Sequence, residues 1–137
     1  MLPEPVQPAD WPAPRGYSNG VRARGTTIAV AGQVGWDPLT GGFSSDDFTA
    51  QCAQALRNVA AVLAAAGALP RHTIRLTWYI TSAAEYAAAG KALGAAYRSV
   101  FGDHYPAMSV VVVAGLLEPR AKIEIEATAV LPEGVDG

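Results

Sequence analysis

Polar and apolar positions along the chain follow two spacings that predict different elements. From 73 to 81 and from 121 to 127 they alternate one by one, which is typical of strands with one drier face. The run from Val110 to Val113 is continuously apolar and β-branched after the Pro106 loop, which indicates a strand buried on both faces. A turn around Pro119 separates this run from the last alternating strand.

Helical spacing appears in two segments. Ser44 or Ser45 is expected to cap the first helix, with acidic residues in its first turn and Gly67 as its stop. Its apolar stripe comprises Phe48, Cys52, Leu56, Val59, Val62 and Leu63. Ser82 and Glu85 have the spacing of a capping box, which predicts a second helix from about 83 to 101. Gly90 and Gly94 inside that helix predict a close approach of another backbone.

The N-terminal part differs from the rest in its proline content. Residues 1–14 carry five prolines, so we expect an extended segment ahead of a single domain at 15–132 and a short tail at 133–137. Residues 17–24 and 26–34 flank Gly25 and are interpreted as a hairpin. The order β-β-α-β-α-β-β then predicts an α+β, ferredoxin-like fold with two helices on one face of a mixed sheet.

Two helices leave the second face of such a sheet uncovered. An apolar run like 110–113 is found where both sides are buried, and we expect other copies of the chain to cover the open face. The alternative is that the run bends under a helix of its own chain.

Charge and cysteine content narrow the class of protein. Ten Lys and Arg against 12 Asp and Glu give a net charge of −2, so nucleic acid is disfavoured as the main partner. Cys52 is the single cysteine, the first residues lack the pattern of a signal peptide, and no apolar run has the length of a membrane span. We therefore expect a cytoplasmic protein.

Candidate chemistry centres on the last strand. Lys122, Glu124 and Glu126 lie on one face of an otherwise apolar strand. Carboxylates at such positions are unusual and are therefore candidates for a functional role. His72 and His104 form no ligand cluster, and there is no glycine-rich phosphate loop, so we expect neither a metal nor a cofactor.

Several segments together resemble one family, the Rid family of enamine and imine deaminases, also called the YjgF family. They are GYSNGV at 16–21, AGQV at 31–34 with DP at 37–38 and TG at 40–41, QALRNV at 54–59, AAG at 65–67, YPA at 105–107 and IEIEA at 123–127. The resemblance implies a chorismate-mutase-like fold, a homotrimer whose sheets form a central barrel, and small-molecule sites in the clefts between subunits.

The resemblance also implies roles for individual residues. Glu124 matches a glutamate that positions the attacking water, and Tyr17 matches a tyrosine that lines the cleft. Met108 stands where typical deaminases of the family carry the arginine that clamps the substrate carboxylate. Backbone amides near Gly32 or Ala107 are expected to hold a polar group.

For three of these residues a purely structural role stays open beside the functional one. Arg120 is either a replacement guanidinium for the cleft or an ordinary exposed turn residue, Glu124 a catalytic or a solvated carboxylate, and Tyr17 a cleft or a packing residue.

Two functions from different classes follow from these residues. An organised Glu124 favours a hydrolytic deaminase of enamines or imines, acting on a substrate larger or less anionic than 2-aminoacrylate. The missing arginine favours the alternative, a small-molecule-binding trimer without catalysis. Endoribonuclease activity is a third and weaker alternative.

Overall fold

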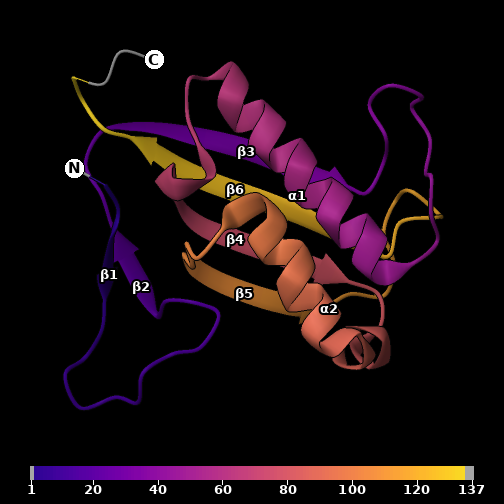
Figure 1. The fold of residues 1–137 in the computed structure, drawn as a ribbon, viewed down its shortest axis with the longest axis horizontal. Helices are drawn as coiled ribbons and strands as arrows, with labels where there is room; N and C mark the ends of the chain where they lie inside the picture. Colours follow the sequence, from indigo (N-terminus) through magenta and orange to yellow (C-terminus); the bar gives the residue numbers. More distant parts are fainter. Residues whose placement is uncertain (1, 135–137) are drawn as a thin grey trace.

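A computed structural model describes residues 2–134 of the chain (Figure 1). The elements are β1 (Glu4–Val6), β2 (Gly20–Arg22), β3 (Thr26–Val34), α1 (Phe48–Ala65), the short 3₁₀ turn η1 (Pro70–His72), β4 (Thr73–Ile80), α2 (Ala83–Phe101), β5 (Ala107–Val112) and β6 (Ile123–Leu131). Of the expected segments at 1–14 and 133–137, residue 1 and residues 135–137 lie outside the described part.

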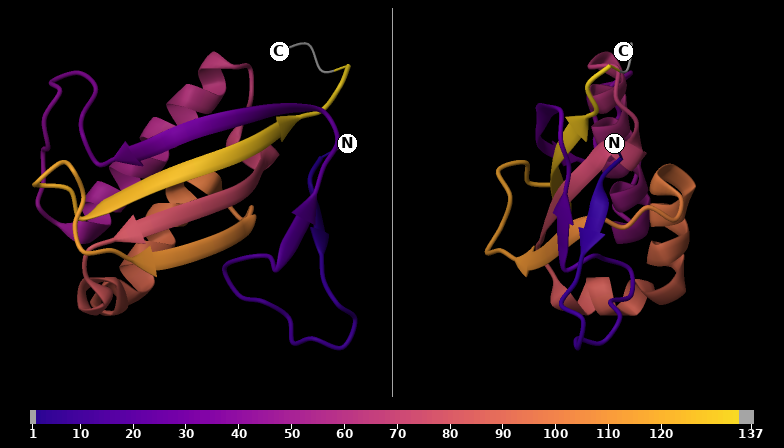
Figure 2. Two further views of the ribbon diagram at one scale, coloured as in Figure 1. Left: turned by 180° about the vertical axis from the view of Figure 1, so that it is seen from behind. Right: turned by 90° about the vertical axis from the view of Figure 1, so that its left-hand side faces the viewer.

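The main sheet has four strands in the order β3-β6-β4-β5, with β4 and β5 parallel and the other neighbours antiparallel. Both α-helices cover the same face, and the other face is open (Figures 1 and 2). The predicted α+β class, with a mixed sheet and two helices on one side, is confirmed. No helix within residues 2–134 has the length and hydropathy needed to cross a bilayer.

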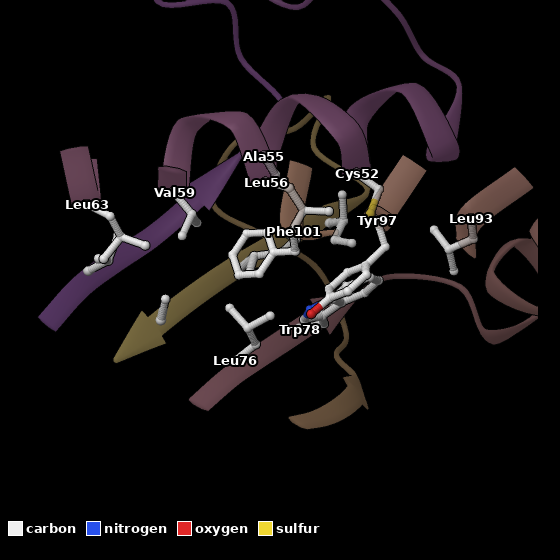
Figure 3. Packing of buried hydrophobic residues seen from close by; sticks show 14 of the residues in the cluster. Cys52, Ala55, Leu56, Val59, Leu63, Leu76, Trp78, Leu93, Tyr97 and Phe101 are labelled. Carbon is white, nitrogen blue, oxygen red and sulfur yellow. The ribbon is translucent and has the colours of Figure 1, made fainter. Parts of the chain in front are cut away.

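The core lies between this helical layer and the sheet (Figure 3). Cys52, Leu56 and Leu63 of α1 are completely buried, as the helical stripe predicted. Val62, also predicted to be in that stripe, is 40% exposed, because it lies at the edge of the stripe, about 120° around the helix from Leu56. The alternation of β4 and β6 directs Leu76, Trp78, Ile80, Ile123 and Ile125 toward the helices.

The predicted hairpin between residues 17–24 and 26–34 is wrong. β2 pairs with β1 instead, and the two form a separate two-stranded ribbon beside the main sheet (Figure 1). An ion pair of 3.1 Å between Arg22 and Glu4 supports this pairing. Gly25 has a φ of +148° and lies so close to the Leu131 carbonyl that a Cβ atom there would be 2.0 Å from its oxygen. This backbone approach directs the chain into the main sheet as β3, paired with β6.

The caps of both helices differ in detail from the predicted ones. Asp47, and not a serine, is the N-cap of α1, since its carboxylate accepts from the Ala50 amide at 2.9 Å. Ser82 caps α2 as predicted. The Glu85 carboxylate, however, pairs with Lys122 Nζ at 3.0 Å rather than completing the capping box. An ion pair to Lys122, just before β6, therefore replaces the hydrogen bond from the Ser82 amide to the Glu85 carboxylate that a capping box contains.

Two buried amides fix the strands that carry the candidate site. Gln51 accepts from the Lys122 amide at 2.8 Å and donates to the Arg120 carbonyl at 3.1 Å, which anchors the start of β6. Asn58 donates to the carbonyls of Val34 and Trp36, which anchors the end of β3. Buried amides with satisfied hydrogen bonds hold their partners in one geometry. α1 thereby sets the position of β3 against β6.

Candidate functional site

Glu124 lies in the middle of the open face of the sheet. In the register of β6 it is opposite Val34 of β3 and Tyr79 of β4, and its side chain is half-buried. Its neighbours Ile123 and Ile125 are fully buried on the helical side. Within the described residues, the Glu124 carboxylate makes no hydrogen bond or ion pair, so it is free to engage a ligand.

The backbone of Gly32 lies directly against this carboxylate. The β3–β6 ladder is irregular between Val30 and Gln33, and a Cβ atom built on Gly32 would be 2.6 Å from Glu124 Oε2. Any side chain at position 32 would therefore displace the carboxylate. Two residues expected in one site, Glu124 and Gly32, are in contact.

Tyr17 and Ala107 lie close together at a second place, the start of β5. Ser18 bridges to Ala107 in a parallel arrangement, and its hydroxyl donates to the Tyr105 carbonyl at 2.6 Å. Tyr17 is 41% exposed and lines a hollow of about 360 Å³ between the β1–β2 ribbon and the α2–β5 loop. Ala107 is registered with Arg75, four residues along β4 from the partner of Glu124, which corresponds to about 13 Å.

Met108 is on the other side of the sheet. It is registered with Leu76, whose side chain faces the helices, and it packs against the core. It lines a pocket of about 240 Å³ between α2 and the β4–β5 edge, which we call the α2 pocket. Residues lining this pocket include Trp78, Tyr86, Tyr97, Arg98, Tyr105 and Met108. Within one chain, Met108 and Glu124 therefore face opposite sides of the sheet.

Arg120 is engaged elsewhere. Its guanidinium forms an ion pair with Asp46 at 2.8 Å, donates to the Phe43 carbonyl at 3.2 Å and lies 5.5 Å from the centre of the Phe43 ring. These contacts hold Arg120 against the loop before α1, away from both Met108 and Tyr17.

A second carboxylate on the open face has a defined partner. Tyr79 donates its hydroxyl to Glu126 at 2.6 Å, and this hydrogen bond, followed by desolvation, raises the pKa of Tyr79. Sequence reasoning assigned Glu126 to a solvated face and did not connect it with Tyr79. Alternation placed both residues on the polar face, but their register across β4 and β6 could not be read from the sequence.

No group of three or more His, Cys, Asp or Glu residues that could hold a metal ion occurs among residues 2–134. His104 instead contacts the Thr73 carbonyl through Nε2 at 2.7 Å and ties the α2–β5 loop to β4.

Comparisons with known proteins agree with this architecture. A family described as Endoribonuclease L-PSP matches residues 9–131. The chain is 37% identical over 117 residues to the 2-iminobutanoate/2-iminopropanoate deaminase of Salmonella typhimurium, covering 83% of this chain and 86% of that protein. Two solved structures are also similar. The Rid-family protein YyfB from Yersinia pestis has a TM-score of 0.81 and 34% identity, with 96% of this chain and all of that chain (100%) covered. Escherichia coli TdcF with bound serine has a TM-score of 0.69 and 31% identity, covering 94% and 99%.

Proposed function

Because this chain belongs to the endoribonuclease L-PSP family, the family of the Rid proteins, we propose that it hydrolyses a reactive imine or enamine. The observation that carries the proposal is the Glu124 carboxylate, which is half-buried over Gly32 and has no partner among the described residues. The 37% identity to a protein named as an imine deaminase supports the same reaction class.

The reaction needs one proton acceptor close to water. Glu124 takes a proton from a water molecule as the water oxygen bonds to the imine carbon, and passes this proton to the imine nitrogen, which gives an adduct with a hydroxyl and an amino group on one carbon. Glu124 then takes the proton of that hydroxyl and passes it to the nitrogen as the C–N bond breaks, so that a carbonyl compound and ammonia leave. A positioned carboxyl group of this kind contributes about 10²–10⁴ in rate.

Backbone groups are proposed to hold the rest of the substrate. The β3–β6 ladder pairs neither Ala31 nor Gly32 with a residue of β6, so the irregular stretch can present peptide groups beside Glu124. The Ala107 peptide and the Tyr17 side chain are proposed to contact the substrate at the start of β5.

We further propose that the working unit is a homotrimer. Glu124 with Gly32, Tyr17 with Ala107, and Met108 lie at separate places on one chain, and we propose that one copy supplies what its neighbour lacks. The exposed apolar residues of β5, Val111 at 40% and Val112 at 59%, support an interface along that edge.

The activity test compares two glutamates. Glu124→Gln preserves shape and removes proton transfer, so hydrolysis of imines generated in situ by an amino-acid oxidase should fall by about 10²–10⁴. Glu118→Gln, in the exposed β5–β6 loop, is the matched control and should retain the parent rate. Imine decay is followed by ultraviolet absorbance. A Glu124→Gln protein as fast as the parent would contradict the proposed role of Glu124.

Met108 favours a second candidate, a trimer that binds small molecules without turning them over. A thioether cannot form the two parallel hydrogen bonds by which a guanidinium holds a carboxylate. If the parent accelerates none of a panel of imines and yet binds their carbonyl products in a calorimetric titration, this second function replaces the first.

A further inference from the structure

The α2 pocket combines aromatic walls with one cation. Trp78, Tyr97 and Tyr105 line it from β4, α2 and the α2–β5 loop, and Met108 lines it from β5. Tyr97 stacks on Tyr105 with ring centres 5.2 Å apart and lies 6.3 Å from the ring of Trp78. Figure 3 shows Trp78 and Tyr97 lying together in the core, between Leu93 and the residues of α1. Such walls suit a flat apolar group.

Arg98 supplies the cation. Its guanidinium folds back along α2 over Gly94, where a Cβ atom would be 3.0 Å from Nη1. Among the residues that the structure describes, no carboxylate or carbonyl accepts from this guanidinium. Its charge and its planar set of donors are therefore free for a ligand at the rim of the pocket.

Two further features occur at the pocket, a kink in α2 and a buried indole donor in Trp78. α2 departs from helical geometry at Gly90, with a φ of 52° and a ψ of −128°, and a Cβ atom there would meet nothing within 4 Å. This kink, visible in the angle between the first turns of α2 and the rest (Figure 1), leaves the pocket open beside it. Trp78 also has a buried Nε1 without a hydrogen-bond partner within residues 2–134.

We propose that the α2 pocket binds aromatic carboxylates of one ring, with Arg98 holding the carboxylate and the aromatic walls enclosing the ring. Arg98 thus takes over at α2 the carboxylate recognition that Met108 cannot provide on β5. The volume of about 240 Å³ suits a ligand of this size and lies below the usual range for drug-sized ligands. Resting on the proposed function, in which a neighbouring copy of the chain supplies Glu124, this assigns the imines of aromatic amino acids as the preferred substrates.

Binding is tested with two probes of the same shape. Phenylacetate carries the charge, phenylacetamide does not, and both are titrated calorimetrically into the parent, Arg98→Met and Arg57→Met proteins. Arg57 is exposed on α1 and its guanidinium hydrogen-bonds only to Gln54 among the described residues, so it controls for the loss of one positive charge.

Arg98→Met should weaken phenylacetate binding about 10-fold, because a charge-assisted hydrogen bond is lost, and should leave phenylacetamide binding unchanged. Arg98→Lys should restore part of the affinity, since an ammonium retains the charge without the planar fork. Equal phenylacetate affinity in the parent and Arg98→Met proteins, or an equal loss in Arg57→Met, would overturn the inference.

The same variants separate this inference from the proposed function. If the parent hydrolyses imines and Arg98→Met keeps the full preference for aromatic over aliphatic ones, the assignment of Arg98 fails while the deaminase function stands. If no imine is hydrolysed and phenylacetate binding still depends on Arg98, the pocket stands and the deaminase function fails.

Discussion

Among single residues, burial governs the acid–base behaviour of Cys52. It was expected in the core and is completely buried, and this burial raises the pKa of its thiol from 9.0 to about 12. The unfolded chain loses the thiol proton first as the pH rises, so the folded state binds more protons between these values. We expect the free energy of unfolding to fall across this window, by at most about 1.4 kcal/mol per pH unit. Urea denaturation at about pH 8 and about pH 10 measures the fall in the parent and in Cys52→Ala. The pKa values of Tyr79 and Tyr97 are also raised, by a hydrogen bond to Glu126 and by burial respectively, and both residues are present in the two proteins, so their contributions cancel. Equal pH dependences in the parent and Cys52→Ala would therefore contradict the assignment to Cys52.

Among elements, α2 contains two glycines with opposite conformational requirements. Sequence reasoning expected another backbone to approach both, and this expectation is wrong, since open space lies beside Gly90 and the Arg98 side chain lies beside Gly94. Gly94→Ala is expected to raise the free energy of unfolding by about 0.5–1 kcal/mol, because alanine loses less entropy in a helix. The same methyl group should push the guanidinium aside and weaken phenylacetate binding. Gly90→Ala should lower stability by about 1–3 kcal/mol, because its backbone angles are unfavourable for a residue with a side chain. Chemical denaturation of the parent, Gly90→Ala and Gly94→Ala measures these free energies of unfolding. Equal changes in the two variants would show that the backbone angles of Gly90 do not lower the stability of Gly90→Ala.

For the whole molecule, the open face of the sheet and the exposed β5 edge predict that several copies of the chain associate. Light scattering at micromolar concentration should give about three times the 14.2 kDa chain mass, because copies that cover this face stabilise each other. Val111 lies on the open face opposite Tyr79, so Val111→Lys should shift the mass toward that of one chain. Leu39→Lys, 93% exposed in the loop before α1, is the matched control and should leave the mass unchanged. A parent that runs as a monomer would contradict the shared site.

The sequence by itself determined the local features of this protein. The extent of α2, the end of α1 at Gly67, and the outward direction of Glu124 between two buried isoleucines follow from periods of 3.6 and 2, which neighbouring residues set alone. The strand predicted at 110–113 was also identified, although it spans Ala107–Val112, where β4 offers a parallel partner. It was expected to be buried on both faces, whereas Val111 and Val112 are exposed within one chain. The family could be identified because its segments keep their spacing along the chain.

Only the tertiary structure decided which of these segments meet. Whether β2 pairs with β3 or β1, and which face Met108 occupies, depend on strand register, which forms between residues far apart in the chain. Arg120 forms its ion pair with Asp46, 74 positions away in the chain, and the spacing of polar and apolar residues did not predict this partner. Arg98 lies only four residues from Gly94, but the pocket beneath it exists because β4 and β5 bring Trp78 and Met108 under the kink of α2. Contacts of this kind are fixed by packing in three dimensions, and therefore the cation of the proposed carboxylate site became visible only in the fold.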